Sequence, residues 1–119
     1  MADMEERVEL NYLMDFYGPL LTAHRQEIMR LYCEEDLSHQ EIADQLDITR
    51  QGVFDAIDKA RRQLAAYEDA LGLLRRHRAQ AELARQCLEA LEGVRPLEGQ
   101  AALERARGML RQMLEDAAD

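Results

Sequence analysis

Hydrophobic residues recur every three or four positions over much of the chain, with charged and polar residues between them. The first two hydrophobic stripes are Val8, Tyr12, Leu13 and Phe16, and then Ile28, Leu31 and Tyr32. This spacing matches the turn of an α-helix and predicts helices that each bury one face.

Residues that cap or break helices mark where the first two helices end. Gly18 and Pro19 end a first helix over residues 3–17, because glycine suits a helix C-terminus and proline cannot continue a helix. Thr22 is placed to cap a second helix that runs to about Glu34.

The next two helices begin with equally clear caps. Ser38 and Glu41 form the S-x-x-E capping box and predict a third helix over residues 39–46. Thr49 caps a fourth helix, which we expect to run to about Leu71.

The third and fourth helices have the spacing of a helix-turn-helix. Small and branched apolar residues stand at the predicted helix crossing and around the turn: Ala43, Leu46, Ile48, Val53, Ala56 and Ile57. A compact turn leaves room only for such residues. Asp47 takes the turn position where glycine is common, and aspartate tolerates left-handed backbone angles better than most residues.

The segment from Tyr67 to Leu91 carries a seven-residue repeat. One repeat position reads Tyr67, Leu74, Ala81 and Leu88, and the other reads Ala70, His77, Ala84 and Leu91. Such a repeat predicts a coiled-coil-like seam, with a bend where Gly72 interrupts the helix.

A final helix should fold back on this segment. Gly93-Val94-Arg95-Pro96 is the strongest break in the chain, and a helix over about 97–117 follows it. Its apolar positions are Leu103, Ala106, Leu110, Met113 and Leu114. We expect the two helices to pack antiparallel, with Met109 and Met113 as core fillers.

The predicted fold is all-α: a helix-turn-helix without a wing, followed by a C-terminal hairpin of long helices. Residues 1–66 would form the helix-turn-helix domain with its N-terminal helix, and residues 67–119 a hairpin that serves dimerisation. Two helices packed only on each other would leave part of their apolar stripes exposed, which is unusual in monomers. The hairpin therefore predicts a homodimer.

Composition supports a globular protein and lowers the expectation of DNA binding. The chain has 119 residues, of which 47% are hydrophobic and 33% charged, and its formal net charge is −9. Residues 1–64 hold 14 acidic and 7 basic side chains, net −7. A dedicated nucleic-acid binder usually carries the opposite sign.

Other classes of function find no support in the sequence. The acidic N-terminal stretch resembles neither a signal peptide nor a membrane span, so we expect a cytoplasmic protein with no membrane partner. Cys33 and Cys87 should then be reduced thiols on packed helices. Without a phosphate loop, an activated nucleophile or paired metal ligands, we expect no enzyme activity, no cofactor and no metal.

The outer face of the fourth helix holds the candidate nucleic-acid contacts. Thr49, Arg50 and Gln51 at its start could touch DNA, with Arg50 and Gln51 suited to reading bases, and Arg61 and Arg62 could touch phosphates. The same face carries Asp55 and Asp58, each four residues before a base, Lys59 and Arg62. Such pairs stabilise a helix and describe an equally simple alternative, a self-neutralised solvated face.

Two further features are candidate protein or RNA contacts. Phe54 flanks the outer face and either anchors an interface or packs against the first helix. Arg75, Arg76 and Arg78 form the one dense basic cluster, which either contacts an acidic partner or RNA backbone or lies in solvent.

Four stretches resemble the YlxM family of small bacterial helix-turn-helix proteins. They are MDFYGPLLT at 14–22, LYCEEDLSHQEIA at 31–43, ITRQGVFDAI at 48–57 and YEDALGL at 67–73. The resemblance covers about residues 8–75 well and the tail loosely. More distantly, residues 20–64 resemble the promoter-reading region four of sigma factors.

The resemblance implies a function class. The family is associated with the signal recognition particle pathway, because its genes lie beside those for the particle's GTPase and its receptor. It implies a regulatory protein without enzyme activity that binds a protein or the RNA of the particle. A DNA-binding transcriptional regulator that reads DNA weakly through the helix 49–64 is the alternative.

Overall fold

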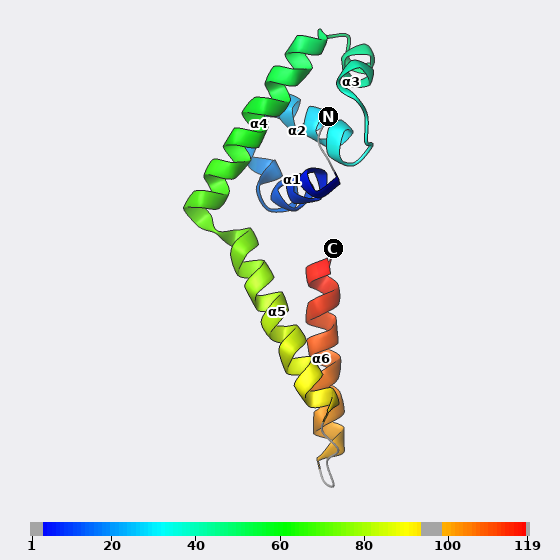
Figure 1. Cartoon of the computed structure of the whole chain (residues 1–119), viewed down its shortest axis with the longest axis vertical. Coiled ribbons are helices and arrows are strands. Elements are labelled where there is room, and N and C mark those ends of the chain that lie inside the picture. Colours follow the sequence, from blue (N-terminus) through cyan, green and yellow to red (C-terminus); the bar gives the residue numbers. More distant parts are fainter. Residues whose placement is uncertain (1–3, 94–98, 119) are drawn as a thin grey trace. The chain divides into compact units, whose positions relative to one another are not determined.

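A computed structural model describes residues 4–93 and 99–118, and all the regular structure in this part is helical (Figure 1). The elements are α1 (Met4–Tyr17), the short 3-10 helix η1 (Gly18–Leu20), α2 (Ala23–Cys33), α3 (His39–Leu46), α4 (Arg50–Leu71), α5 (Leu73–Glu92) and α6 (Gln100–Ala118). The predicted all-α fold is confirmed. The predicted turn at residues 94–96 and the predicted start of the last helix at residue 97 lie outside the described residues.

The predicted caps begin the helices as expected. Ser38 accepts a hydrogen bond from the Glu41 backbone N–H at 3.1 Å, and the Glu41 carboxylate accepts one from the Ser38 N–H at 3.0 Å. The hydroxyl of Thr49 accepts from the Gly52 N–H at 2.9 Å. These bonds satisfy backbone donors that a helix leaves unpaired at its first turn.

The turn between α3 and α4 also forms as expected. Asp47 adopts the left-handed conformation, with φ 55° and ψ 48°, and ends α3. Its backbone N–H donates to the Ala43 carbonyl, and the Ile48 N–H donates to the same oxygen at 3.0 Å. The predicted turn of the helix-turn-helix is therefore confirmed at Asp47, the position where glycine is common.

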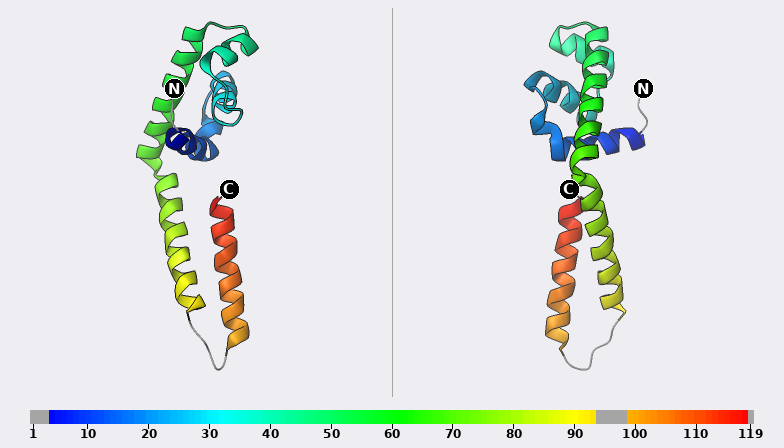
Figure 2. Two further views of the ribbon diagram at one scale, coloured as in Figure 1. Left: turned by 45° about the vertical axis from the view of Figure 1, so that its right-hand side comes forward. Right: turned by 90° about the vertical axis from the view of Figure 1, so that its left-hand side faces the viewer.

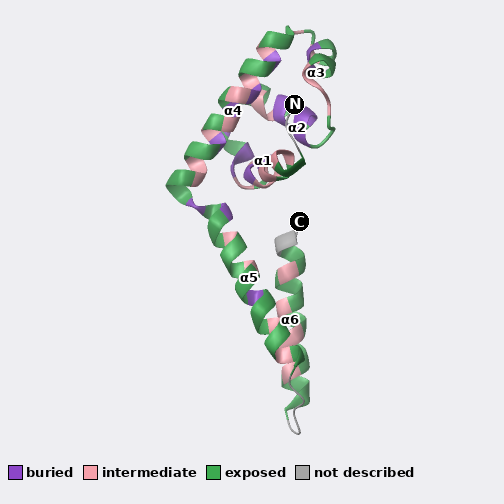
Figure 3. Cartoon of the chain, in the orientation of Figure 1, coloured by how far each residue is buried: buried purple, intermediate pink, exposed green. Residues whose placement is uncertain are grey.

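One core unites α1 to α4 (Figure 3). Helix α4 packs against α1, α2 and α3 through four residues on one face, Val53, Ile57, Ala60 and Leu64. All four are at least 98% buried, as their spacing predicts. The predicted inner face of α2, with Ile28, Leu31 and Tyr32, is buried as well.

The predicted inner face of α1 is wrong in part. Leu13 is buried as predicted, and Tyr12 and Phe16 are partly buried against the core, whereas Val8 is 47% exposed. The fully buried set is Leu10, Leu13 and Tyr17, which also has helical spacing and lies on a face rotated from the predicted one. Tyr17, which the prediction left out, is completely buried.

Tyr17 reaches the end of α4 and the start of α5. Its hydroxyl donates to a Glu68 carboxylate oxygen at 2.7 Å and accepts from the Leu73 N–H at 3.0 Å. The same Glu68 oxygen accepts from the Leu74 N–H at 2.9 Å. Gly72, with φ 63°, ends α4 in the left-handed conformation that glycine adopts without strain.

The first part of the predicted seven-residue seam is wrong, because its residues Tyr67 and Leu74 pack in the first unit. Tyr67 lies in α4 with its ring centroid 5.9 Å from that of Tyr17, and Leu74 is 98% buried in the same core. The positions that continue the seam in α5, Ala81, Ala84, Leu88 and Leu91, are half-buried or buried. The chain divides into two compact units, Met1–Leu74 and Arg75–Asp119, whereas the sequence predicts a boundary between residues 66 and 67.

In the second unit, α5 and α6 run antiparallel (Figure 2). Arg111 pairs with Glu92 at 2.8 Å, and Arg107 donates to the Leu91 carbonyl at the end of α5. Of the apolar residues in this unit whose burial is described, one is fully buried, Ala84. Met109 and Met113 are 64% and 51% exposed, so their predicted role as core fillers is wrong.

Candidate nucleic-acid interface

The first turn of α4 presents its polar side chains to solvent. Thr49 is held as the cap, and Arg50 and Gln51, which follow it, are exposed. Arg50 and Gln51 lie beside the start of α3, where both line a hollow with His39. These three predicted contacts are thus brought together on one surface.

The acidic residues on the outer face of α4 are partly neutralised. Asp58 pairs with Arg62 at 3.1 Å, as the four-residue spacing predicts. Asp55 accepts a hydrogen bond from the Gln51 side-chain amide at 3.0 Å. Gln51 is therefore already engaged with an acid of its own helix.

Arg61 and Arg62, both predicted phosphate contacts, are placed apart. The Arg62 side chain is 79% exposed. Arg61 turns towards α1, pairs with Glu6 at 2.8 Å, and has a buried Nε atom with no hydrogen-bond partner among the described residues. Arg61 thus joins α4 to α1 and is half withdrawn from solvent.

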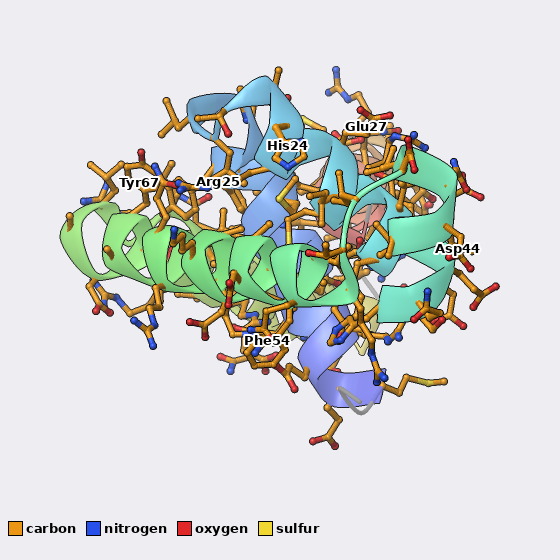
Figure 4. All side chains as sticks on the ribbon, turned by 90° about the horizontal axis from the view of Figure 1, so that it is seen from above. His24, Arg25, Glu27, Asp44, Phe54 and Tyr67 are labelled. Carbon is orange, nitrogen blue, oxygen red and sulfur yellow. The ribbon has the colours of Figure 1, made fainter. Side chains whose placement is uncertain are left out.

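Phe54 is exposed and contacts α3. Its side chain projects from the side of α4 opposite His24 and Arg25, and the residue is 52% exposed (Figure 4). The Phe54 ring meets the His39 ring edge to face, with centroids 5.9 Å apart. The His39 ring lies 5.6 Å from that of Tyr32. Three rings from three helices therefore form one continuous aromatic row.

Three hollows surround His39. The first, about 260 Å³, is lined by Arg7, Tyr32, Ser38, His39, Gln40 and Arg50. A wider one, about 430 Å³, lies between His39, Arg50, Gln51 and Phe54. A third, about 210 Å³, extends along Tyr32, His39, Phe54 and Arg61 and is also lined by Glu6, Ile57 and Asp58. His39 is common to all three hollows.

The arginines around these hollows differ in how many contacts they make within the protein. The Arg7 guanidinium lies 4.5 Å from the centre of the Tyr32 ring, donates to the Tyr32 carbonyl at 2.9 Å and pairs with Asp36. Arg50 forms no ion pair within the described part of the chain. Arg50 is therefore the guanidinium best placed to receive an anion from outside.

The electrostatic state of His39 follows from this setting. Burial lowers the pKa of His39 below its ordinary value of 6.5, and the guanidinium groups of Arg50, Arg61 and Arg7 lower it further. At neutral pH, His39 is an uncharged ring among cations. Sequence reasoning missed His39, Tyr32 and Arg7, which become neighbours only when α1, α2 and α3 pack together.

The lowered pKa predicts a pH-dependent stability. Below about pH 6.5 the unfolded chain binds a proton at residue 39 that the folded chain resists, so stability should fall as the pH drops through this range. His39→Gln should flatten this fall, measured by urea unfolding at about pH 7.5 and about pH 5.5. His24→Gln, at an exposed position on α2, is the matched control. An unchanged pH dependence in His39→Gln would contradict the prediction.

The predicted basic cluster lies in the other unit. Arg75, Arg76 and Arg78 occupy the first turns of α5, where all three are exposed. An exposed basic stretch at a helix start leaves both predicted interpretations open, a contact with an acidic partner or RNA backbone and a solvated face.

Groups that could support other chemistry are dispersed or inert. Burial raises the pKa of the Cys33 thiol to about 11, which keeps it protonated and unreactive. Cys87 is exposed on α5, contrary to the expectation of a packed position. Among residues 4–93 and 99–118, no three metal-binding side chains converge, and none of the helices there is long and apolar enough to cross a membrane.

Comparison with known proteins extends the similarity beyond the region seen in the sequence. Residues 4–102 match the sequence profile of the family described as "Putative helix-turn-helix protein, YlxM / p13 like" (UPF0122). A "UPF0122 protein" of Desulforamulus reducens is 37% identical over 116 residues, covering 98% of this chain and 99% of that protein. A UPF0122 protein of Geobacillus kaustophilus is 42% identical over 89 residues, or 75% of this chain and 77% of that protein.

Proposed function

Because the chain belongs to the YlxM / p13-like family of helix-turn-helix proteins, we propose that it is a non-enzymatic regulator of the signal recognition particle pathway. It acts by binding the RNA of the particle. The binding surface is the start of α4 together with the start of α3, where Arg50, Phe54 and His39 lie.

One observation carries this proposal. Arg50 is exposed, has no acidic partner within the described residues, and stands beside the exposed aromatic ring of Phe54 and the ring of His39. A free guanidinium suits a phosphate, and an exposed ring suits a base that is not paired. RNA loops and bulges offer both groups together.

The charge on α4 favours such an RNA over a DNA duplex. A helix that lies in the major groove brings its whole outer face close to two phosphate strands. Asp55 and Asp58 occupy that face and would oppose the phosphates. A single loop nucleotide at the start of α4 requires no approach of these aspartates to a second strand.

The test is a titration of the full chain with the particle's RNA and with duplex DNA of random sequence, each at two salt concentrations. We expect the RNA to bind more tightly and the affinity to fall with salt on a shallow slope, because few phosphates are neutralised. Binding only to the particle's protein, or equal affinity for RNA and duplex, would refute the proposal.

A DNA-binding regulator is the second candidate. The observation in its favour is that Arg50 and Gln51 stand at the start of the second helix of a helix-turn-helix, where base contacts are usually made. On this reading the duplex complex is weak because of the two aspartates. Tight and sequence-selective duplex binding at physiological salt would favour this candidate over the first.

Removing the two aspartates should strengthen duplex binding. Asp55→Asn with Asp58→Asn removes two negative charges from the outer face of α4 and should raise the affinity for random duplex about three- to tenfold at low salt. Electrophoretic mobility shift measures the change. Asp15→Asn with Asp69→Asn alters the net charge equally at other exposed positions, and an equal gain there would show that only total charge matters.

The second unit predicts a homodimer. Leu83, Met109 and Met113 are 61%, 64% and 51% exposed, and the two methionines lie one turn apart on α6. A two-helix hairpin with so little buried apolar surface is marginal alone. A second copy offers the same exposed apolar side chains, so the contact can be symmetric. Light scattering should give twice the chain mass of 13.7 kDa.

Substitution of these exposed apolar side chains should separate the copies. Leu83→Glu with Met109→Glu places charges in the proposed contact, where burying an unpaired charge is costly. We expect the mass of one chain for this variant. Leu20→Glu, at an exposed leucine of η1, should leave the mass unchanged. A one-chain mass for the unmodified protein would contradict the prediction.

A further inference from the structure

The hollow between Arg7 and Arg50 has the size and lining of a small ligand site. Its volume is about 260 Å³, slightly below the roughly 300–1,000 Å³ of sites for drug-sized ligands. It is lined by residues from α1, α2, α3 and α4, so the packing of the first unit shapes it. A paired base held in a duplex could not enter a recess of this kind.

The lining combines rings, cations and neutral polar groups. Tyr32 and His39 supply the rings, with centroids 5.6 Å apart. Arg7 covers the Tyr32 ring at 4.5 Å and is held there by the Tyr32 carbonyl and by Asp36. Its guanidinium is thus fixed as part of the wall.

The rest of the lining is less constrained than Arg7. Arg50 is exposed and also lines the wider hollow beside Phe54. The side chains of Ser38 and Gln40 also border the recess. The Ser38 hydroxyl accepts the capping bond of α3 and keeps its own hydrogen to donate, and the Gln40 amide nitrogen donates to Asp44 at 2.9 Å and leaves its carbonyl oxygen to accept from the edge of a base.

We propose that this recess holds one unpaired nucleotide, with its base against the ring of His39 and its phosphate on Arg50. Phe54 supports a neighbouring base at the mouth. This inference rests on the proposed binding of RNA and names the part of the RNA that is bound. Aromatic faces accept any base, because every base has a π face, so the site selects unpaired nucleotides before it selects sequence.

An acidic peptide fits these features less well. A carboxylate would use Arg50 but would gain no contact with the rings of His39 and Phe54. A nucleotide uses the cation and the rings together.

The first experiment uses single nucleotides and does not depend on RNA binding. The full chain is titrated, by NMR, with each of the four nucleoside 5′-monophosphates, with inorganic phosphate and with polyglutamate. We expect the ring signals of His39, Tyr32 and Phe54 to shift with the nucleotides. The pKa of His39 should rise on binding, because the phosphate favours the charged ring. Equal shifts with phosphate alone or with polyglutamate would overturn the proposal.

The second experiment uses the particle's RNA with 2-aminopurine at an unpaired position. Stacking in the recess should quench its fluorescence, and His39→Ala or Phe54→Ala should lower RNA affinity about five- to hundredfold. Leu20→Ala, at an exposed site away from the recess, should change neither. Circular dichroism of each variant checks that the fold is kept.

The outcomes separate this inference from the proposed function. RNA that binds while the rings and the 2-aminopurine do not respond overturns the nucleotide site and leaves the proposed function standing. Nucleotides that shift the rings while the particle's RNA does not bind support the site and refute the proposed function. If the nucleotides do not shift the ring signals and the particle's RNA does not bind, both the nucleotide site and the proposed function are overturned.

Discussion

Leu64→Ala should lower the free energy of unfolding of the first unit by about 2–5 kcal/mol. Leu64 is fully buried in the core where α4 packs against α1 and α2. Truncation there loses the transfer free energy of the side chain and leaves a cavity that the rigid crossing of the helices cannot close. For a unit of this size, the melting temperature should fall by at least about 8 °C.

The control is Leu20→Ala, which makes the same chemical change in the same unit. Leu20 is 54% exposed, so its truncation should change stability by less than about 0.5 kcal/mol. Urea unfolding followed by circular dichroism measures both variants. Similar losses at the two sites would show that the packing of α4 is not what stabilises this unit.

Arg50→Ala should lower the affinity for the particle's RNA by about ten- to hundredfold at low salt. The guanidinium lacks an acidic partner within the described residues, so its loss removes a charge-assisted contact without breaking an internal bond. The slope of affinity against salt should also fall by about one unit for each lost phosphate contact. Fluorescence anisotropy at several salt concentrations measures both quantities.

Arg30→Ala is the matched control for this change. Arg30 lies on α2, is partly exposed and is 3.6 Å from Glu35, so the variant has the same net charge as Arg50→Ala. Only a small change in RNA affinity is expected. If the two variants lost affinity equally, general charge rather than the start of α4 would explain binding. If neither lost affinity, the proposed surface would be wrong.

Features that depend on residues close together in the sequence were predictable. The capping box uses Ser38 and Glu41, three positions apart, and the Thr49 cap bonds to Gly52. The left-handed turn at Asp47 follows from the tolerance of aspartate for that conformation. Such signals act within one helical turn, so the helix-turn-helix and the limits of α3 and α4 could be predicted before the structure was known.

Helical spacing also determined much of the core but could not choose between adjacent faces of one helix. On α1, the stripes that begin with Val8 and with Leu10 both have helical spacing. The structure buries the second because Tyr17 then reaches Glu68 and Leu73, more than fifty positions away. A periodic pattern states that one face is buried, and the partner helices decide which face.

The sequence by itself therefore determined the all-α class, the caps, the turn and the polar start of α4 with Arg50 and Gln51. Tertiary structure alone decided that Arg61 pairs with Glu6 on α1 and that Leu74 joins the core of the first unit. It also brought Arg7, Tyr32 and His39 together from three helices around one recess. The physical reason is distance along the chain: caps and turns act between neighbours, whereas these contacts depend on how whole helices are rotated and crossed.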